Sequence, residues 1–181
     1  MLRVVSILTF FIFCIACTSS KIYIVRHAEK GKDPADNPHL SELGVARAND
    51  LANMLQGKHI AQIYSTELNR TIETAKPLSD KINVPIKYYR NDSLLQNLVR
   101  IVQSEKNTLI VGHSNTVLKM LDALQVAHPH VKEIPDNKYD YMFILRIKAK
   151  NPVGYSYHLR EITYGKPSPA PGDSSGAATM K

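Results

Sequence analysis

The stretch Lys21-Ile-Tyr-Ile-Val-Arg26, followed directly by His27-Ala28-Glu29, decides the fold of this chain. The first six residues are mostly β-branched or aromatic, and they are short and apolar enough for a buried strand. Arg26 and His27 stand where that strand must end. The stretch therefore predicts a buried strand with basic side chains at its carboxyl end.

Strand and helix patterns alternate along the chain that follows. Each expected strand precedes a segment whose apolar residues recur at helical spacing. The expected strands are residues 21–26, 60–64, 85–89 and 108–111.

Polar residues mark where the helices are expected to begin. Ser41 and Thr66 stand at the starts of the first two helices, and Asp92 or Ser93 at the start of the third. Each of these side chains can accept a hydrogen bond from a backbone N–H of the first helical turn. Pro77 is expected to end or kink the second helix.

The last part of the domain changes pattern. Residues 143–148 and 153–159 alternate between apolar and polar, and Asn151-Pro152 lies between them as a turn. Four strand–helix units followed by such a hairpin predict an α/β fold. We expect a three-layer α/β/α arrangement with a mainly parallel open sheet and a C-terminal β-hairpin.

The two ends of the 181-residue chain are expected to lie outside this domain. Arg3 precedes the uncharged run Val4–Ala16, which is shorter than the about 20 residues that span a bilayer. Residues 1–16 are therefore interpreted as a signal peptide, and an uncleaved N-terminal anchor is the alternative. We expect a short linker over residues 17–20, the domain over 21–164, and a disordered tail over 165–181 that is rich in Gly, Pro, Ser and Ala.

Cys14-Ile15-Ala16-Cys17 also resembles a bacterial lipoprotein cleavage site, in which Cys17 would carry lipid. Both interpretations predict export, either to the bacterial periplasm or as a membrane-anchored lipoprotein of the cell envelope. Export, and basic residues that are scattered rather than clustered, argue against a nucleic-acid partner. The formal net charge of +7 therefore indicates mainly a solvated basic surface.

Polar residues at the strand ends are expected to meet. In open parallel sheets, ligands bind beyond the carboxyl ends of the strands. Arg26 and His27 follow the first strand, Arg70 the second, Asp92 the third and His113 the fourth. Arginine forks bind phosphoryl oxygens in pairs, and a neutral imidazole can attack phosphorus. The convergence predicts a site for a phosphoryl group.

Three of these segments also match a known family in order. Arg26-His27-Ala28-Glu29, residues 63–75 around Arg70, and residues 111–116 around His113 resemble the signature of the histidine phosphatase superfamily, which includes the cofactor-dependent phosphoglycerate mutases. The resemblance implies that His27 is the nucleophile and forms a phosphohistidine. It further implies that Arg26, Arg70 and His113 hold the transferring oxygens, that water releases phosphate, and that neither a metal nor an organic cofactor takes part.

The sequence departs from this family at one point. Many members carry a glutamate after the third strand that protonates the leaving group, and residues 91–97 contain none. Asp92 is the nearest substitute, with a helix N-cap as its alternative role, and Asp140 and Glu29 are further candidates. If none of them acts, substrates with good leaving groups, such as phosphoramidates or acid anhydrides, are favoured. We expect a small phosphorylated substrate or a phosphopeptide.

Two other interpretations are open at this stage. Gly112-His113-Ser114-Asn115-Thr116 resembles the nucleophile elbow of α/β-hydrolases, with Ser114 as the nucleophile, although Thr116 stands where that motif has glycine. A protein that binds a phosphorylated ligand without turnover would use the same cationic residues. His128-Pro129-His130 lacks a third ligand and does not indicate a metal site.

Overall fold

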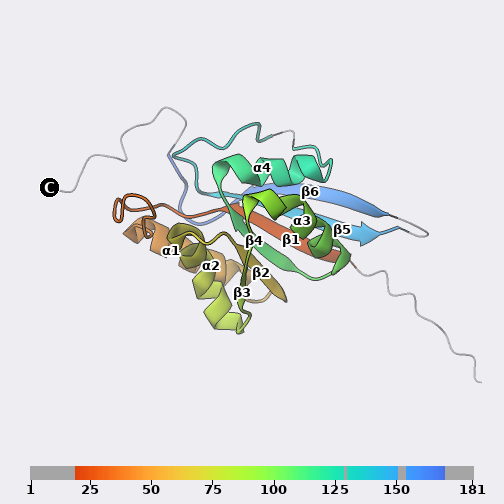
Figure 1. Cartoon of the computed structure of the whole chain (residues 1–181), viewed down its shortest axis with the longest axis horizontal. Coiled ribbons are helices and arrows are strands. Elements are labelled where there is room, and N and C mark those ends of the chain that lie inside the picture. Colours follow the sequence, from red (N-terminus) through yellow and green to blue (C-terminus); the bar gives the residue numbers. More distant parts are fainter. Residues whose placement is uncertain (1–18, 129, 151–153, 170–181) are drawn as a thin grey trace, which may run out of the picture.

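The computed structural model describes residues 19–128, 130–150 and 154–169 of the chain (Figure 1). A six-stranded sheet runs through it in the order β3-β2-β4-β1-β5-β6, and the first four of these strands are parallel to one another. β5 runs antiparallel to β1, and β6 antiparallel to β5. The strands are β1 (Ser19–Arg26), β2 (Gln62–Ser65), β3 (Ile86–Tyr88), β4 (Thr108–Gly112), β5 (Tyr141–Ala149) and β6 (Tyr155–Thr163).

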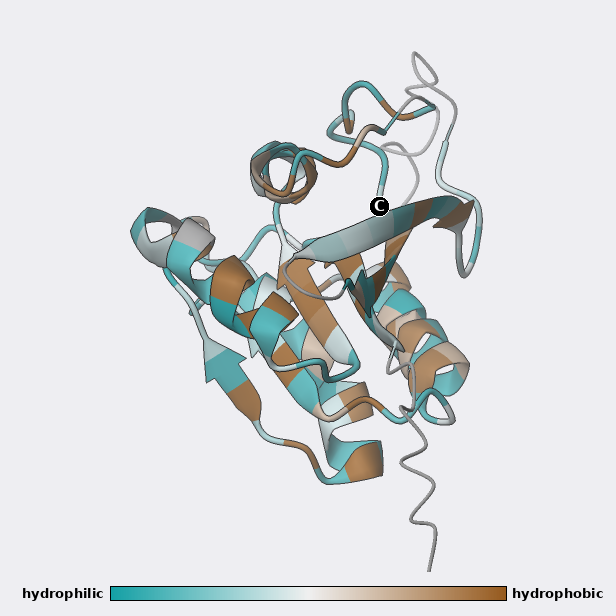
Figure 2. Cartoon of the chain, turned by 90° about the vertical axis from the view of Figure 1, so that its right-hand side faces the viewer, coloured by the Kyte–Doolittle hydropathy of each residue, from teal (hydrophilic) through white to brown (hydrophobic). Residues whose placement is uncertain are grey.

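Helices cover both faces of this sheet, so the expected three-layer α/β/α fold with a mainly parallel sheet and a C-terminal hairpin is confirmed. The helices are α1 (Glu42–Leu55), α2 (Asn69–Ile82), α3 (Leu94–Gln103) and α4 (Ser114–Ala123), with a short 3-10 turn η1 (Asn91–Ser93) before α3. Figure 2 shows the hydrophobic colour in the middle of the sheet, with mixed colours on the helices at either side.

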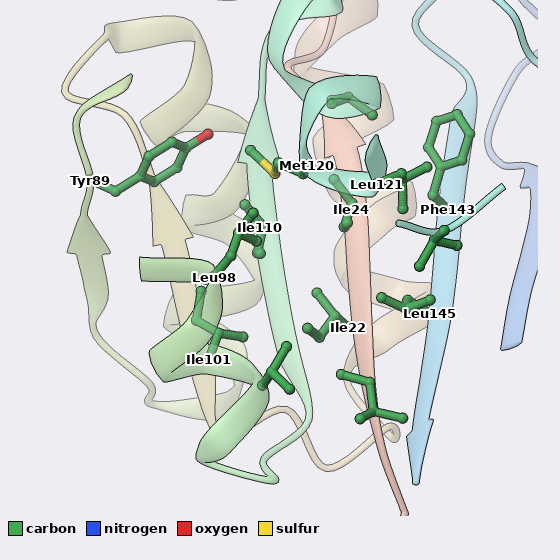
Figure 3. Close-up of a cluster of buried hydrophobic side chains, with 14 of the residues drawn as sticks. Ile22, Ile24, Tyr89, Leu98, Ile101, Ile110, Met120, Leu121, Phe143 and Leu145 are labelled. Carbon is green, nitrogen blue, oxygen red and sulfur yellow. The ribbon is translucent and has the colours of Figure 1, made fainter. Parts of the chain in front are cut away.

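β1 packs against both helical layers. Ile22 and Ile24 belong to the core under α3 and α4, which Figure 3 shows in close-up. Tyr23 and Val25 point the other way, into the core under α1 and α2. Successive side chains of a strand alternate between the faces of a sheet, so a strand between two helical layers needs apolar residues at every position. This explains the continuous apolar run of β1.

The predicted start of α2 is wrong, and Pro77 does not end this helix. The N-cap position of α2 is Leu68, not Thr66, and α2 continues through Pro77 to Ile82. A proline inside a helix costs about 3 kcal/mol through the lost hydrogen bond and steric contact. Ala75 and Leu78 on the same helix are fully buried, and their packing offsets that cost.

The start of α3 also differs from the prediction. Ser93 occupies the N-cap position, but no side-chain hydrogen bond caps the helix. Asp92 lies in η1, one residue further from α3. Neither of the two predicted caps therefore closes the first turn of α3.

Several predictions concern the ends and the hairpin turn. The signal peptide over residues 1–16, the lipid site at Cys17 and the turn at Asn151-Pro152 lie outside the described residues. β1 already begins at Ser19, which pairs with Lys148 of β5, inside the predicted linker. Among the helices of the described part, none combines the length and the apolar character needed to cross a membrane.

The domain extends beyond its predicted end at Tyr164. The Arg47 Nη2 donates a hydrogen bond to the Lys166 carbonyl oxygen at 2.8 Å. The Ser168 N–H donates to Asp140 Oδ2 at 3.0 Å, and Ser168 Oγ accepts from the Tyr139 N–H at 3.0 Å. Residues 165–169 are thus held by buried polar groups from distant parts of the chain, which composition alone does not reveal; residues 170–181 lie outside the described part.

The first turn of α1 packs directly on the backbone beside His27. The Ser41 N–H donates to the Glu29 carbonyl oxygen at 2.9 Å, and Ser41 Oγ accepts from the Gly44 N–H at 3.2 Å, as the predicted cap should. A Cβ atom at Gly44 would lie 2.1 Å from the Glu29 carbonyl oxygen. Only glycine allows this close approach, because any side chain would push α1 away from the loop that carries His27.

We expect Gly44→Ala to lower the free energy of unfolding by about 1–3 kcal/mol, the usual cost of overpacking. Gly57→Ala is the matched control, because a Cβ at Gly57 meets no atom within 4 Å. We expect the control to change stability by no more than about 0.5 kcal/mol. Urea unfolding of both variants measures the difference, and equal stabilities would contradict the packing described here.

Candidate active site

A pocket of about 360 Å³ opens at the carboxyl ends of β1 and β4. Register places Arg26 of β1 beside Gly112 of β4, so the residues that follow both strands lie together. The structure brings the predicted Arg26, His27, Arg70 and His113 to this one pocket. Its lining residues are Arg26, His27, Lys30, Leu68, Arg70, His113, Ser114, Asn115 and Asp136.

His27 is fixed in one tautomer and kept uncharged. Its side chain is buried, and Nδ1 lies 2.8 Å from the Ala28 carbonyl oxygen. A carbonyl oxygen can only accept, so Nδ1 carries the proton and Nε2 keeps its lone pair. Burial is the main cause that lowers the pKa of His27 to about 3; the nearby charges of Arg26 and Arg70 act in the same direction, and the Ala28 hydrogen bond acts against them. At neutral pH His27 is therefore a neutral base with an available Nε2.

His113 stands beside His27, with ring centres 5.5 Å apart in an edge-on arrangement. Its Nε2 is within hydrogen-bond distance of Thr66 Oγ1, at 3.0 Å. Burial, together with the charges of Arg70 and Arg26, lowers the pKa of His113 to about 4. Thr66 thus orients the second histidine instead of capping α2.

Arg26 is buried and holds a distant loop. Its Nη1 donates to the carbonyl oxygens of Pro135 at 2.7 Å and Lys138 at 3.0 Å, and its guanidinium lies 4.4 Å from the centre of the Tyr139 ring. Its Nε is buried and has no hydrogen-bond partner among the described residues. Burial lowers the pKa of Arg26, since the charged form loses hydration. Nε is therefore a buried donor that the described residues leave without a partner.

Arg70 lies in the first turn of α2, where the helix dipole adds to its positive charge. Partial burial lowers the pKa of Arg70. Thr74, one turn later, accepts a hydrogen bond from the Ala28 N–H at 2.9 Å and donates to the Arg70 carbonyl oxygen at 2.7 Å. One hydroxyl thus connects the loop of His27 to the turn that carries Arg70.

Glu29, a predicted proton donor, is not on this pocket. It forms a two-pronged ion pair with Arg47, whose Nη2 lies 2.7 Å and Nε 2.9 Å from the carboxylate oxygens. The buried Arg47 also donates to the Tyr164 carbonyl oxygen at 2.9 Å. Glu29 therefore connects the His27 loop to α1 and to the end of the domain.

Asp140 and Asp92 also lie elsewhere. Asp140 is buried and accepts from the Ser168 N–H, with Lys138 Nζ 3.4 Å away. Asp92 is exposed and pairs with Arg90 at 3.2 Å. The partners of all three predicted carboxylates explain why none of these carboxylates lines the pocket.

Asp136 is the carboxylate that does line it. Its side chain is exposed, and Oδ1 lies 3.7 Å from Arg26 Nη2. Lys30 and Asn115 also reach the pocket. Asp136 and Lys30 lie in loops without a periodic pattern, so nothing in the sequence marked them as site residues.

A second hollow of about 220 Å³ adjoins the pocket and shares Leu68 and His113 with it. Thr66, Glu67, Tyr89 and Arg90 complete its lining. Arg90 and Glu67 give this hollow one side chain of each charge.

Other candidate chemistries find little support in the described residues. No group of three or more His, Cys, Asp or Glu side chains there could hold a metal ion. His128 Nε2 lies 2.9 Å from Asp122 Oδ1, and His128 Nδ1 lies 2.8 Å from the Val131 carbonyl oxygen. These contacts give His128 a structural role. Ser114 is the first residue of α4, and no hydrogen bond in the described part joins it to a histidine.

Comparison with known proteins points to one family. A model of the histidine phosphatase superfamily (branch 1) matches residues 22–91, which include Arg26, His27 and Arg70. Phosphoserine phosphatase 1 of Hydrogenobacter thermophilus is 36% identical over 72 residues, or 36% of this chain. The match spans about a third (34%) of the length of that relative.

Solved structures share the fold over most of the chain. A protein histidine phosphatase SixA in complex with tungstate has a TM-score of 0.59 at 15% identity, over 79% of this chain and 96% of that one. A SixA-type protein from Nakamurella multipartitia has a TM-score of 0.56 at 17% identity, over 82% of this chain and 96% of that one. A mycobacterial glucosyl-3-phosphoglycerate phosphatase has a TM-score of 0.55 at 14% identity, over 71% of this chain and 91% of that one. At sequence identities this low, the similarity to these structures shows a shared fold and nothing more specific.

Proposed function

Because the histidine phosphatase superfamily model matches residues 22–91, we propose that this chain is a phosphatase of that superfamily and hydrolyses a phosphomonoester or a phosphoramidate through a phosphohistidine on His27. The observation that carries the proposal is the uncharged His27, with Nδ1 bound to the Ala28 carbonyl oxygen and Nε2 available, in a pocket that also holds Arg26 and Arg70. A nucleophile needs that lone pair, and a dianionic phosphoryl group needs that positive charge.

The reaction runs in two steps. His27 Nε2 attacks phosphorus, a nitrogen–phosphorus bond forms, and the bond to the leaving group breaks. Arg26, Arg70 and His113 hold the three phosphoryl oxygens during this transfer. Water then attacks the phosphohistidine, which releases inorganic phosphate and restores the neutral imidazole. Phosphoryl transfer depends mainly on positioning and charge stabilisation, which these side chains supply.

The leaving group needs a proton unless it is a weak base. Asp136 lies beside Arg26 on the pocket, while Glu29, Asp140 and Asp92 are each held by other partners. Of these four carboxylates, Asp136 is the one whose side chain lines the pocket. Asp136 is therefore the proton donor in this proposal.

We expect His27→Ala to abolish phosphate release across sugar phosphates, nucleotides, phosphopeptides and phosphoramidates, because the nucleophile is lost. Ser114→Ala is expected to retain most of the release. Phosphohistidine and phosphoserine come first in the screen, given the phosphatases that this chain resembles. Loss of release in Ser114→Ala alone would support a serine hydrolase. Phosphate-ligand binding without any release would support a binding protein.

Asp136→Asn is expected to slow hydrolysis of an alkyl phosphate such as phosphoserine by about 10²–10³, the usual scale of general acid catalysis. Hydrolysis of p-nitrophenyl phosphate should change little, because its leaving group departs without a proton. Asp80→Asn is the matched control, since Asp80 pairs with Lys76 on the exposed side of α2 and lines neither the pocket nor the adjoining hollow. Equal effects of Asp136→Asn on both substrates would exclude the role of proton donor.

A further inference from the structure

A groove of about 380 Å³ lies away from the candidate active site, between the sheet and the C-terminal part of α1. Strands β1, β5 and β6 form its floor, and Met54, Leu55 and Lys58 form its side on and after α1. It shares no lining residue with the pocket of His27. Its lining residues are Lys21, Tyr23, Met54, Leu55, Lys58, Met142, Ile144, Arg146, His158, Arg160 and Ile162.

Basic side chains crowd the rim of this groove. Lys21 of β1 stands directly opposite Arg146 of β5, and Arg146 directly opposite His158 of β6. Arg160 and Lys58 add two further positive charges to the lining. Lys21 and Arg146 carry like charges directly opposite each other, which destabilises a sheet, so a bound anion would stabilise this pair.

No acidic side chain supplies that compensation in the described part of the chain. The lining contains no Asp or Glu, and none of its basic side chains forms an ion pair there. The Arg146 Nη2 donates to the neutral Ser19 Oγ at 3.3 Å. The positive charge of this surface is therefore open to an external partner.

The floor between these charges is apolar. Tyr23, Met142, Ile144 and Ile162 line it, and Met54 is 38% exposed at its edge. An apolar floor inside a cationic rim fits a ligand that carries negative charge and hydrocarbon together. Anionic phospholipids have this composition, whereas free inorganic anions and nucleic-acid backbones lack the hydrocarbon.

The position of the groove in the chain favours a membrane. Lys21 lies at the amino end of β1, five residues after the apolar run Val4–Ala16. Five extended residues reach at most about 18 Å, so an uncleaved apolar run, or a lipid on Cys17, would attach within that distance of Lys21. A single short apolar or lipid anchor binds membranes only marginally, and a basic patch beside it is the second signal that stable binding needs.

We propose that the groove formed by β1, β5, β6 and α1 docks on anionic phospholipid membranes, with headgroup phosphates on the cationic rim and hydrocarbon against the apolar floor. Because the groove includes the amino end of β1 and the candidate active site follows the carboxyl end, docking directs the active site away from the lipid surface. The proposal does not depend on the phosphatase function. A second copy of the chain is disfavoured as the occupant, because two such grooves would repel each other.

The test measures partition of the full chain onto sedimented vesicles of neutral phosphatidylcholine, with or without about one third anionic phosphatidylglycerol. We expect wild type to prefer the anionic vesicles, and to lose that preference as salt is raised. Arg146→Glu with Arg160→Glu should lower partition onto anionic vesicles by at least about 25-fold, at about fivefold for each basic residue near the surface. Partition onto neutral vesicles should be unchanged.

The control is Lys119→Glu with Lys132→Glu, which changes the net charge equally at two exposed positions outside the groove. We expect a decrease of less than about threefold, and retained circular dichroism shows that both double variants fold. An equal decrease in both would show a net-charge effect and overturn the proposal. A wild-type protein that shows no preference for anionic vesicles would also overturn the proposal. If the groove variant changed only the molecular mass in analytical sedimentation, and not vesicle binding, the groove would be assigned to a second copy of the chain.

Discussion

Burial of an uncharged histidine among arginines is the constraint on which the rest of this structure depends. A guanidinium removed from water is costly, and Arg26 is only 5% exposed. Carbonyl oxygens of Pro135 and Lys138 and the Tyr139 ring stabilise it, so the charge survives beside His27. Burial and that charge together keep His27 unprotonated. The same feature that makes the pocket attractive to an anion thus leaves the imidazole with an available lone pair.

The fold supplies this arrangement through β1 and the loop after it. Tight packing on both faces of β1 fixes where the strand ends, and the His27 N–H donates to the Gly112 carbonyl oxygen of the neighbouring strand at 2.9 Å. Thr74 connects the next residue to α2, and the Glu29–Arg47 pair connects the loop to α1. His27 and Arg70 are therefore positioned by elements that also pack the core.

Much of the fold and the cationic part of the site could be predicted from the sequence, because parallel strands end at one edge and their following residues meet there. The carboxylates could not be predicted. Glu29 and Asp140 owe their positions to Arg47 and Ser168, which are distant in the chain, and Asp136 lies in a loop without periodicity. Thr66 was predicted to be a helix cap because it precedes a helical pattern. Its contact with His113 Nε2, at 3.0 Å from Thr66 Oγ1, could not be predicted because the two residues are distant in the chain.

The most direct test of the central claim is a ¹⁵N NMR titration of the His27 imidazole between pH 8 and pH 5. With a pKa of about 3, the ring stays neutral over this range, with Nδ1 protonated and Nε2 not. Replacing Arg70 by Ala removes a nearby positive charge and should raise that pKa. A midpoint near the ordinary histidine value of about 6.5 in the wild-type protein would contradict the account.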